Sequence, residues 1–178
     1  MAKRERPRGR GLRGRGQVRE LVMKLWSLVA VAALIFVGNA SSATPINWER
    51  FVVAETGTSV DIPTSVFTED AGKPKGAYGK QFLTSDGRAN LTVESLDNEN
   101  GVSPATFLAR KNPPKHIVYK RVTPRFFVVS SFRNNKIWYD RCNFAASTIS
   151  CVLINYPAAE KREWDGIVTR ISNTLGKG

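Results

Sequence analysis

The sequence predicts an α+β domain in which an antiparallel β-sheet is covered by a short mid-chain helix and a C-terminal amphipathic helix. Three observations support this fold class. Asp86-Gly87 is a favoured two-residue turn between segments of alternating polarity. Four segments rich in β-branched and aromatic residues follow between residues 116 and 156, and apolar residues recur at helical spacing between residues 164 and 175.

The residues before this domain have the composition of a targeting sequence. Residues 1–22 are rich in arginine and glycine and predict a disordered tail, which is absent if translation begins at Met23. Residues 23–43 contain the three parts of a signal peptide: a lysine at the front, an apolar centre, and small residues before an expected cleavage after Ala40 or Ala43.

Residues 44–178 are then expected to form one α+β domain, monomeric and located in the periplasm or secreted. The alternative is an uncleaved segment, residues 21–38, that anchors the protein in the inner membrane. Its apolar part is interrupted by Lys24 and is shorter than the ~20 residues that a spanning helix needs, so cleavage is favoured.

The domain begins with a predicted hairpin and a polar loop. Residues 51–55 and 58–62 flank Thr56-Gly57, which predicts a tight turn, and the second strand ends at Pro63. Residues 69–79 are rich in Gly, Lys and Pro, and we expect them to form a loop at the rim of a binding site.

The Asp86-Gly87 turn sets the register of the next hairpin. Closing the chain there pairs Phe82 with Leu91 and places four apolar side chains on one face. These are Phe82, Ala89, Leu91 and Val93.

Two helices are predicted from their ends and their apolar spacing. Ser103 is the N-cap and Pro104 the first residue of a helix that runs to about Lys111 and ends before Pro113-Pro114. Pro157 opens the last helix, and Gly176 ends it. Its apolar stripe consists of Trp164, Ile167, Val168, Ile171 and Leu175.

The two cysteines predict a disulfide. A turn centred between Ala146 and Ser147 places Cys142 and Cys151 opposite each other on adjacent strands, and an exported protein is in a compartment where such a bond persists. Two cysteines and the single His116 cannot complete a zinc site, and the C-x-x-C motif is absent. We therefore expect no metal and no cofactor.

No catalytic motif is present in the sequence, so no catalytic residue is assigned. It lacks G-x-S-x-G, H-E-x-x-H and the Walker lysine. The alternative is a weak periplasmic hydrolase whose site lies between residues 69–79 and the Asp86-Gly87 hairpin. It would use Ser85, Asp86 and His116, or a base among Asp61, Asp86 and Asp140.

Charge is unevenly distributed along the chain. Residues 1–24 carry nine lysines or arginines and two glutamates and residues 25–43 carry no charge, so residues 44–178 hold +5 of the formal +12. This is only mildly basic and does not indicate nucleic-acid binding. Nucleic-acid binding through the Arg/Gly tail remains an alternative if Met1 is the true start.

Within the domain, the positive charge is concentrated in one region. Seven basic residues are interleaved with aromatic residues: Lys115, Lys120, Arg121, Arg125, Arg133, Lys136 and Arg141. One interpretation is a solvated sheet face whose charges protect an edge strand. The other is a face that binds an acidic protein, an anionic lipid or a cell-envelope polyanion.

Three segments resemble the PsbP-like fold, a small α+β sandwich, over most of residues 48–175. They are TSVDIPTSVF, GKQFLTSDGRANLTVES and YPAAEKREWDGIVTRISNTL. The chain is also similar to small exported bacterial proteins. The resemblance implies a binding or assembly role without catalysis, and the cysteine pair is a departure that the fold does not require. We therefore expect an exported, non-catalytic binding or accessory protein of the cell envelope.

Overall fold

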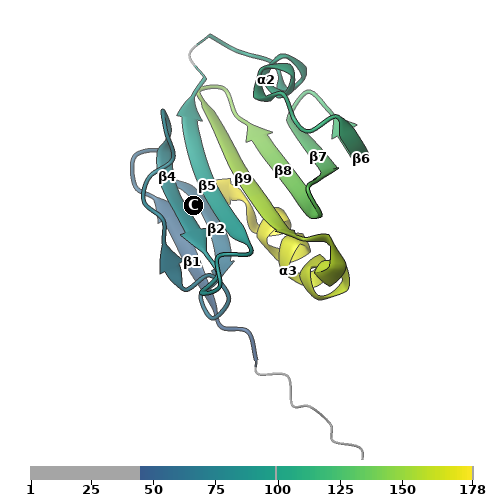
Figure 1. Cartoon of the computed structure of the whole chain (residues 1–178). Helices are drawn as coiled ribbons and strands as arrows, with labels where there is room; N and C mark the ends of the chain where they lie inside the picture. The colour runs from purple at the N-terminus through teal and green to yellow at the C-terminus, as the bar shows by residue number, and fades with distance from the viewer. Residues whose placement is uncertain (1–44, 99, 178) are drawn as a thin grey trace, which may run out of the picture. The chain divides into compact units, whose positions relative to one another are not determined.

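Two antiparallel sheets and two α-helices make up the part of the chain that the computed structural model describes, residues 45–98 and 100–177 (Figure 1). The predicted tail and signal peptide lie outside these residues. The elements are β1 (Trp48–Val53), β2 (Thr58–Pro63), β3 (Glu69–Asp70), β4 (Tyr78–Leu83), β5 (Asn90–Asp97), α2 (Pro104–Lys111), β6 (His116–Val122), β7 (Phe126–Arg133), β8 (Lys136–Phe144), β9 (Thr148–Pro157), the 3₁₀-helix η2 (Ala158–Glu160), α3 (Lys161–Thr174) and β10 (Gly176–Lys177).

The larger sheet has seven strands in the order β3-β4-β5-β9-β8-β7-β6, and the smaller has three in the order β1-β2-β10. Strands β6 to β9 form the predicted meander, with every neighbouring pair antiparallel. The register of β6 on β7 shifts between Ile117 and Tyr119, which marks a β-bulge in the edge strand.

Each face of the larger sheet covers its own apolar core. On one face, β1, β2 and α3 pack on β4, β5 and β9, and this core includes Val60, Leu91, Ile154 and Ile171. On the opposite face, Leu108 of α2 packs on residues of β7, β8 and β9. Side chains alternate along a strand, so even-numbered residues of β9 enter the first core and odd-numbered ones the second.

A buried hydroxyl cluster joins the two sheets. The Thr58 hydroxyl of β2 donates a 2.9 Å hydrogen bond to Ser95 Oγ of β5, and lies 2.7 Å from Ser150 Oγ of β9. All three residues are buried, so their hydrogen bonds offset the cost of removing hydroxyl groups from water.

The Asp86-Gly87 hairpin has the predicted register. Phe82 lies opposite Leu91, and both are buried. The Gly87 N–H donates to the carbonyl oxygen of Thr84 at 2.8 Å, so Ser85 and Asp86 are the central residues of the turn, rather than Asp86 and Gly87 as predicted. Gly87 follows them with a positive φ of 67°, which glycine adopts readily.

The first hairpin differs from the prediction. Val53 pairs with Thr58, so residues 54–57 form the turn, rather than Thr56 and Gly57 alone. The Gly57 N–H closes this longer turn on the Val53 carbonyl at 2.8 Å. The register therefore differs by two residues from the one that a turn at Thr56 and Gly57 implies.

Both helices begin and end close to the predicted residues. The Ser103 hydroxyl accepts a 3.2 Å hydrogen bond from the Thr106 N–H, and α2 runs from Pro104 to Lys111 as predicted. At the C-terminus, Pro157 is instead the last residue of β9, and η2 precedes α3. Two short strands were not predicted: β3 lies within the expected 69–79 loop, and β10 follows α3 and pairs with β2.

Trp164 anchors α3 on the sheet. It is 6% exposed, its ring stacks on Tyr156 with centroids 5.3 Å apart, and it also contacts the ring of Phe67 at 5.7 Å. Its indole N–H donates to Glu160 Oε2 at 3.2 Å. The helix therefore depends on one large aromatic residue for much of its packing area.

We predict that Trp164→Ala lowers the free energy of unfolding by about 3–5 kcal/mol, because it leaves a cavity under α3. Urea denaturation followed by circular dichroism measures the change. Arg162→Ala, on the exposed side of the same helix, is the matched control and should have little effect. Equal losses in the two variants would contradict the anchoring role.

Candidate functional site

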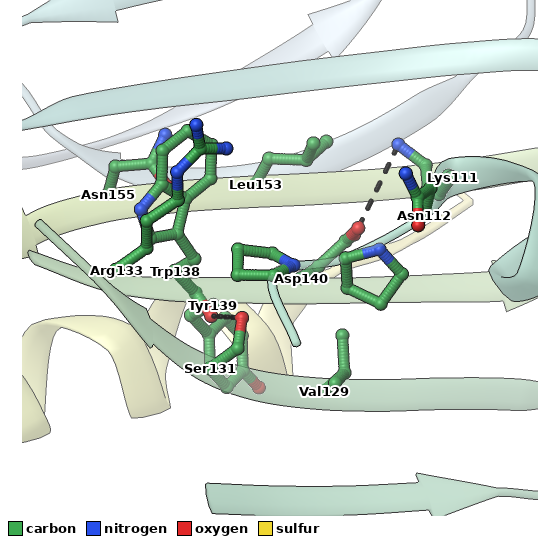
Figure 2. A pocket seen from close by; sticks show the side chains of 12 residues that line it. Lys111, Asn112, Val129, Ser131, Arg133, Trp138, Tyr139, Asp140, Leu153 and Asn155 are labelled. Carbon is green, nitrogen blue, oxygen red and sulfur yellow. Dashed lines mark hydrogen bonds and ion pairs between the residues drawn. The ribbon is translucent and has the colours of Figure 1, made fainter. Parts of the chain in front are cut away.

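A small cavity of about 170 Å³ lies on the α2 side of the larger sheet (Figure 2). It is bounded by the end of α2 and the two prolines after it, and by β7, β8 and β9. Its lining residues are Lys111, Asn112, Pro113, Pro114, Val129, Ser131, Arg133, Trp138, Tyr139, Asp140, Leu153 and Asn155.

The end of α2 brings Lys111 to the sheet. Asn112 adopts the left-handed conformation, with φ 48°, and the following Pro113 and Pro114 prevent the helix from continuing. Lys111 is 17% exposed and places its Nζ 2.6 Å from Oε1 of Glu94 and 3.9 Å from Oδ2 of Asp140. The chain has thus brought two carboxyl groups and one ammonium group together on β5, β8 and α2.

Asp140 is the least satisfied member of this group. Its side chain is 15% exposed, and within the described residues it accepts no hydrogen bond from an N–H or O–H group. Its Oδ1 lies 3.7 Å from Sγ of Cys142, which carries no hydrogen because it is in the disulfide. Burial raises the pKa of Asp140 to about 7; nearby Lys111 lowers this pKa and Glu94 raises it.

The other end of the cavity is lined by Arg133 of β7 and Trp138 of the paired strand β8 (Figure 2). The indole is 38% exposed. Within the described part of the chain, no carboxylate lies within 4.0 Å of the Arg133 guanidinium. This end therefore presents an aromatic wall and a cation without an internal partner.

The structure joins Cys142 and Cys151 in the disulfide that their spacing predicts, and the two residues are paired directly on β8 and β9. Both are fully buried and pack with Leu108 in the second core. This position gives the bond a structural role, because a thiolate would have no access to either sulfur.

The seven basic residues do not form a single face. Arg121 and Arg141 both lie over the ring of Phe126, at 5.4 and 5.3 Å from its centroid, and Arg141 also donates to Ser172 Oγ of α3. Lys120 instead lies beside α2, in a shallow groove with Leu108. Arg133 lines the cavity described above. The strands that carry these residues present them on both sides of the sheet.

The residues proposed for a hydrolase are not brought together. His116 lies on β6, at the far edge of the sheet from the Ser85-Asp86 turn between β4 and β5. Asp86 accepts hydrogen bonds from the Thr84 hydroxyl and from the Arg88 backbone and side chain, which hold its pKa far below the usual value. This aspartate therefore stabilises its turn.

No group of three or more His, Cys, Asp or Glu that could hold a metal ion occurs among residues 45–98 and 100–177. The same part of the chain contains no helix that is long and apolar enough to cross a membrane.

Comparison with known proteins identifies the fold. The chain is an α+β domain with a seven-stranded antiparallel sheet, and it is similar to the solution structure of cyanobacterial PsbP (CyanoP) from Synechocystis sp. PCC 6803. The TM-score is 0.54 at 7% sequence identity, and the match covers 80% of this chain and 99% of that one. No protein-family model matches the sequence, and no curated protein matches it. The PsbP-like fold predicted from the sequence motifs is thereby confirmed.

The raised pKa of Asp140 predicts a pH-dependent stability. In the unfolded chain its carboxyl loses a proton near the ordinary value of 3.8, whereas the folded protein holds the proton up to about 7. Between these values the native state binds more protons, so the contribution of Asp140 to the free energy of unfolding falls as pH rises from about 4 to about 7.

Asp140→Asn removes this titration. We predict that the free energy of unfolding of the variant, minus that of the native protein, increases from pH 4 to pH 7 by on the order of a few kcal/mol. Denaturation curves at a series of pH values provide the measurement. Asp165→Asn, at an exposed position of α3, is the control. If the free energies of unfolding of Asp140→Asn and of the native protein differ by a constant amount from pH 4 to pH 8, the assigned pKa is wrong.

Proposed function

We propose that this chain is an exported, non-catalytic binding or accessory protein of the cell envelope, and that the basic surface formed by Arg121 and Arg141 over the ring of Phe126, with the neighbouring Arg125, binds an acidic segment of a partner protein. One observation carries the proposal. Within the described residues, none of the seven basic residues singled out in the sequence forms an ion pair, whereas six others do. The paired ones are Arg50, Lys80, Arg88, Lys111, Lys161 and Arg170.

The unpaired charges are concentrated by the sequence itself. The forty residues from Asn100 to Tyr139 contain eight lysines or arginines and no aspartate or glutamate. Lys111 is paired with Glu94, but the stretch itself holds no acid to neutralise the other seven, so the surface around β6 carries a positive potential that favours an anionic partner.

Exposed apolar side chains near the basic residues favour a protein as the binding partner over other kinds of anion. Val118 is 64% exposed and Tyr119 52% exposed on β6, and Phe132 of β7 is 38% exposed. These side chains lie among the cations, and a partner that buries both kinds of group has the composition typical of a protein interface. A carbohydrate polyanion would use only the charges.

Two features support action outside the cytoplasm. The buried disulfide is of a kind that persists in oxidising compartments. The sequence of residues 23–43 has the pattern of a signal peptide.

Charge reversal tests the binding surface. We predict that Arg121→Glu with Arg125→Glu weakens binding of a labelled peptide of alternating glutamate and valine by at least about tenfold at low salt, because two attractive contacts become repulsive. Fluorescence anisotropy at two salt concentrations measures the affinity.

Lys73→Glu with Lys75→Glu is the matched control, since it changes net charge equally at exposed positions outside the surface. Equal weakening by both pairs of changes would show that net charge alone matters and would remove the proposed surface. Binding of phosphatidylglycerol vesicles or heparin in preference to the peptide would show that the partner class is wrong.

Intact mass spectrometry of the protein recovered from fractionated cells tests export. We predict a chain that begins at Ser41 or Thr44, is found outside the cytoplasm, and gains the mass of two hydrogens on reduction. A full-length, reduced chain in the cytoplasm would overturn the proposed location.

A further inference from the structure

We propose that the cavity between α2 and β7, β8 and β9 binds a single carboxylate group carried on a small apolar or aromatic body. This inference goes beyond the proposed binding of an acidic protein surface, because it concerns one cavity and can hold or fail separately.

Arg133 is the group that recognises the carboxylate. Its guanidinium lines the cavity and has no carboxylate within 4.0 Å among the described residues. Arg133 is exposed, so its guanidinium is open to an entering ligand. A guanidinium offers two parallel N–H donors that match the two oxygens of a carboxylate, and such charge-assisted hydrogen bonds are stronger than neutral ones.

The body of the ligand has apolar surfaces to contact. Trp138 presents a partly exposed indole, and Val129 of β7 and Leu153 of β9 lie in the lining. At about 170 Å³ the cavity is smaller than the ~300–1,000 Å³ typical of pockets for drug-sized ligands. It therefore accommodates a ring or one apolar side chain together with its carboxylate.

Asp140 sets the charge of the cavity. Two charged groups lie beside it, Lys111 from α2 and Glu94 from β5, while Arg133 lines the opposite end of the cavity from the end of β7. Lys111 is already engaged by Glu94 at 2.6 Å. A protonated Asp140 leaves the cavity with the positive charge of Arg133, whereas an ionised Asp140 lowers the positive potential of the cavity and weakens its attraction for a carboxylate.

The same charges exclude the opposite class of ligand. An ammonium group in this cavity would meet Arg133 at one end and Lys111 at the other, and only Asp140 would attract it. Two kinds of ligand carry such a carboxylate next to an apolar group: a free aromatic acid, and the C-terminus of a peptide that ends in an apolar residue.

The test titrates the disulfide-bonded exported chain with benzoate and with its neutral and cationic analogues, benzamide and benzylamine. A second series uses a short peptide that ends in phenylalanine, either as the free acid or as the amide. Affinity comes from calorimetry, and the NMR signal of the Trp138 indole N–H locates the site. Preference for benzoate or for the free-acid peptide separates the two sources.

We expect benzoate to bind at least about tenfold more tightly than benzamide or benzylamine, and its affinity to rise from pH 8 to pH 6, where it remains ionised. Arg133→Gln should weaken binding about tenfold or more, while Lys136→Gln should not. Asp140→Asn should bind with an affinity that no longer changes with pH.

Arg121→Glu with Arg125→Glu should leave benzoate binding unchanged, so that failure of this site and failure of the acidic-protein surface are distinguishable. Equal affinity for the three small analogues would overturn the proposal. An unchanged Trp138 signal up to about 10 mM of every acid, or full binding by Arg133→Gln, would also overturn it.

Discussion

Burial of β9 on both faces is the constraint on which the rest of the structure depends. None of its ten residues is exposed, and it pairs with β5 on one side and β8 on the other. It therefore joins the N-terminal hairpins to the C-terminal meander. Its even-numbered side chains contribute to the core under α3 and the small sheet, and its odd-numbered ones to the core under α2. A change in its register would expose both cores at once.

Elements with local signals were predictable from the sequence, and elements formed by distant pairing were not. The Asp86-Gly87 turn and the Ser103 cap act within a few residues, so registers and boundaries followed from them. The two residues of β3 and of β10 are too short to show a pattern and exist because β4 and β2 offer free edges. The longer first turn was missed because Gly57 marks only the end of the loop.

The site was less predictable than the fold for the same reason. A cluster of cations is visible in the sequence, but strand alternation and the split between β6, β7 and β8 distribute it over two faces. The cavity is assembled from four separate segments, and Glu94, Lys111 and Asp140 are far apart in the chain. One signal was available in the sequence: Asp140 is the first acid after forty residues without one, and it directly follows the apolar run Ile137-Trp138-Tyr139.

The irregular edge of the larger sheet has a consequence for solubility. β6 is exposed along its whole length and rich in residues that favour strands. An exposed edge strand of this composition is able to pair with the same strand of another copy of the protein. The bulge between Ile117 and Tyr119 interrupts the even row of backbone donors and acceptors that fibril growth requires, and Lys120 and Arg121 would place like charges close together in a stack. The bulge and the two charges therefore oppose the addition of further strands to this edge of the sheet.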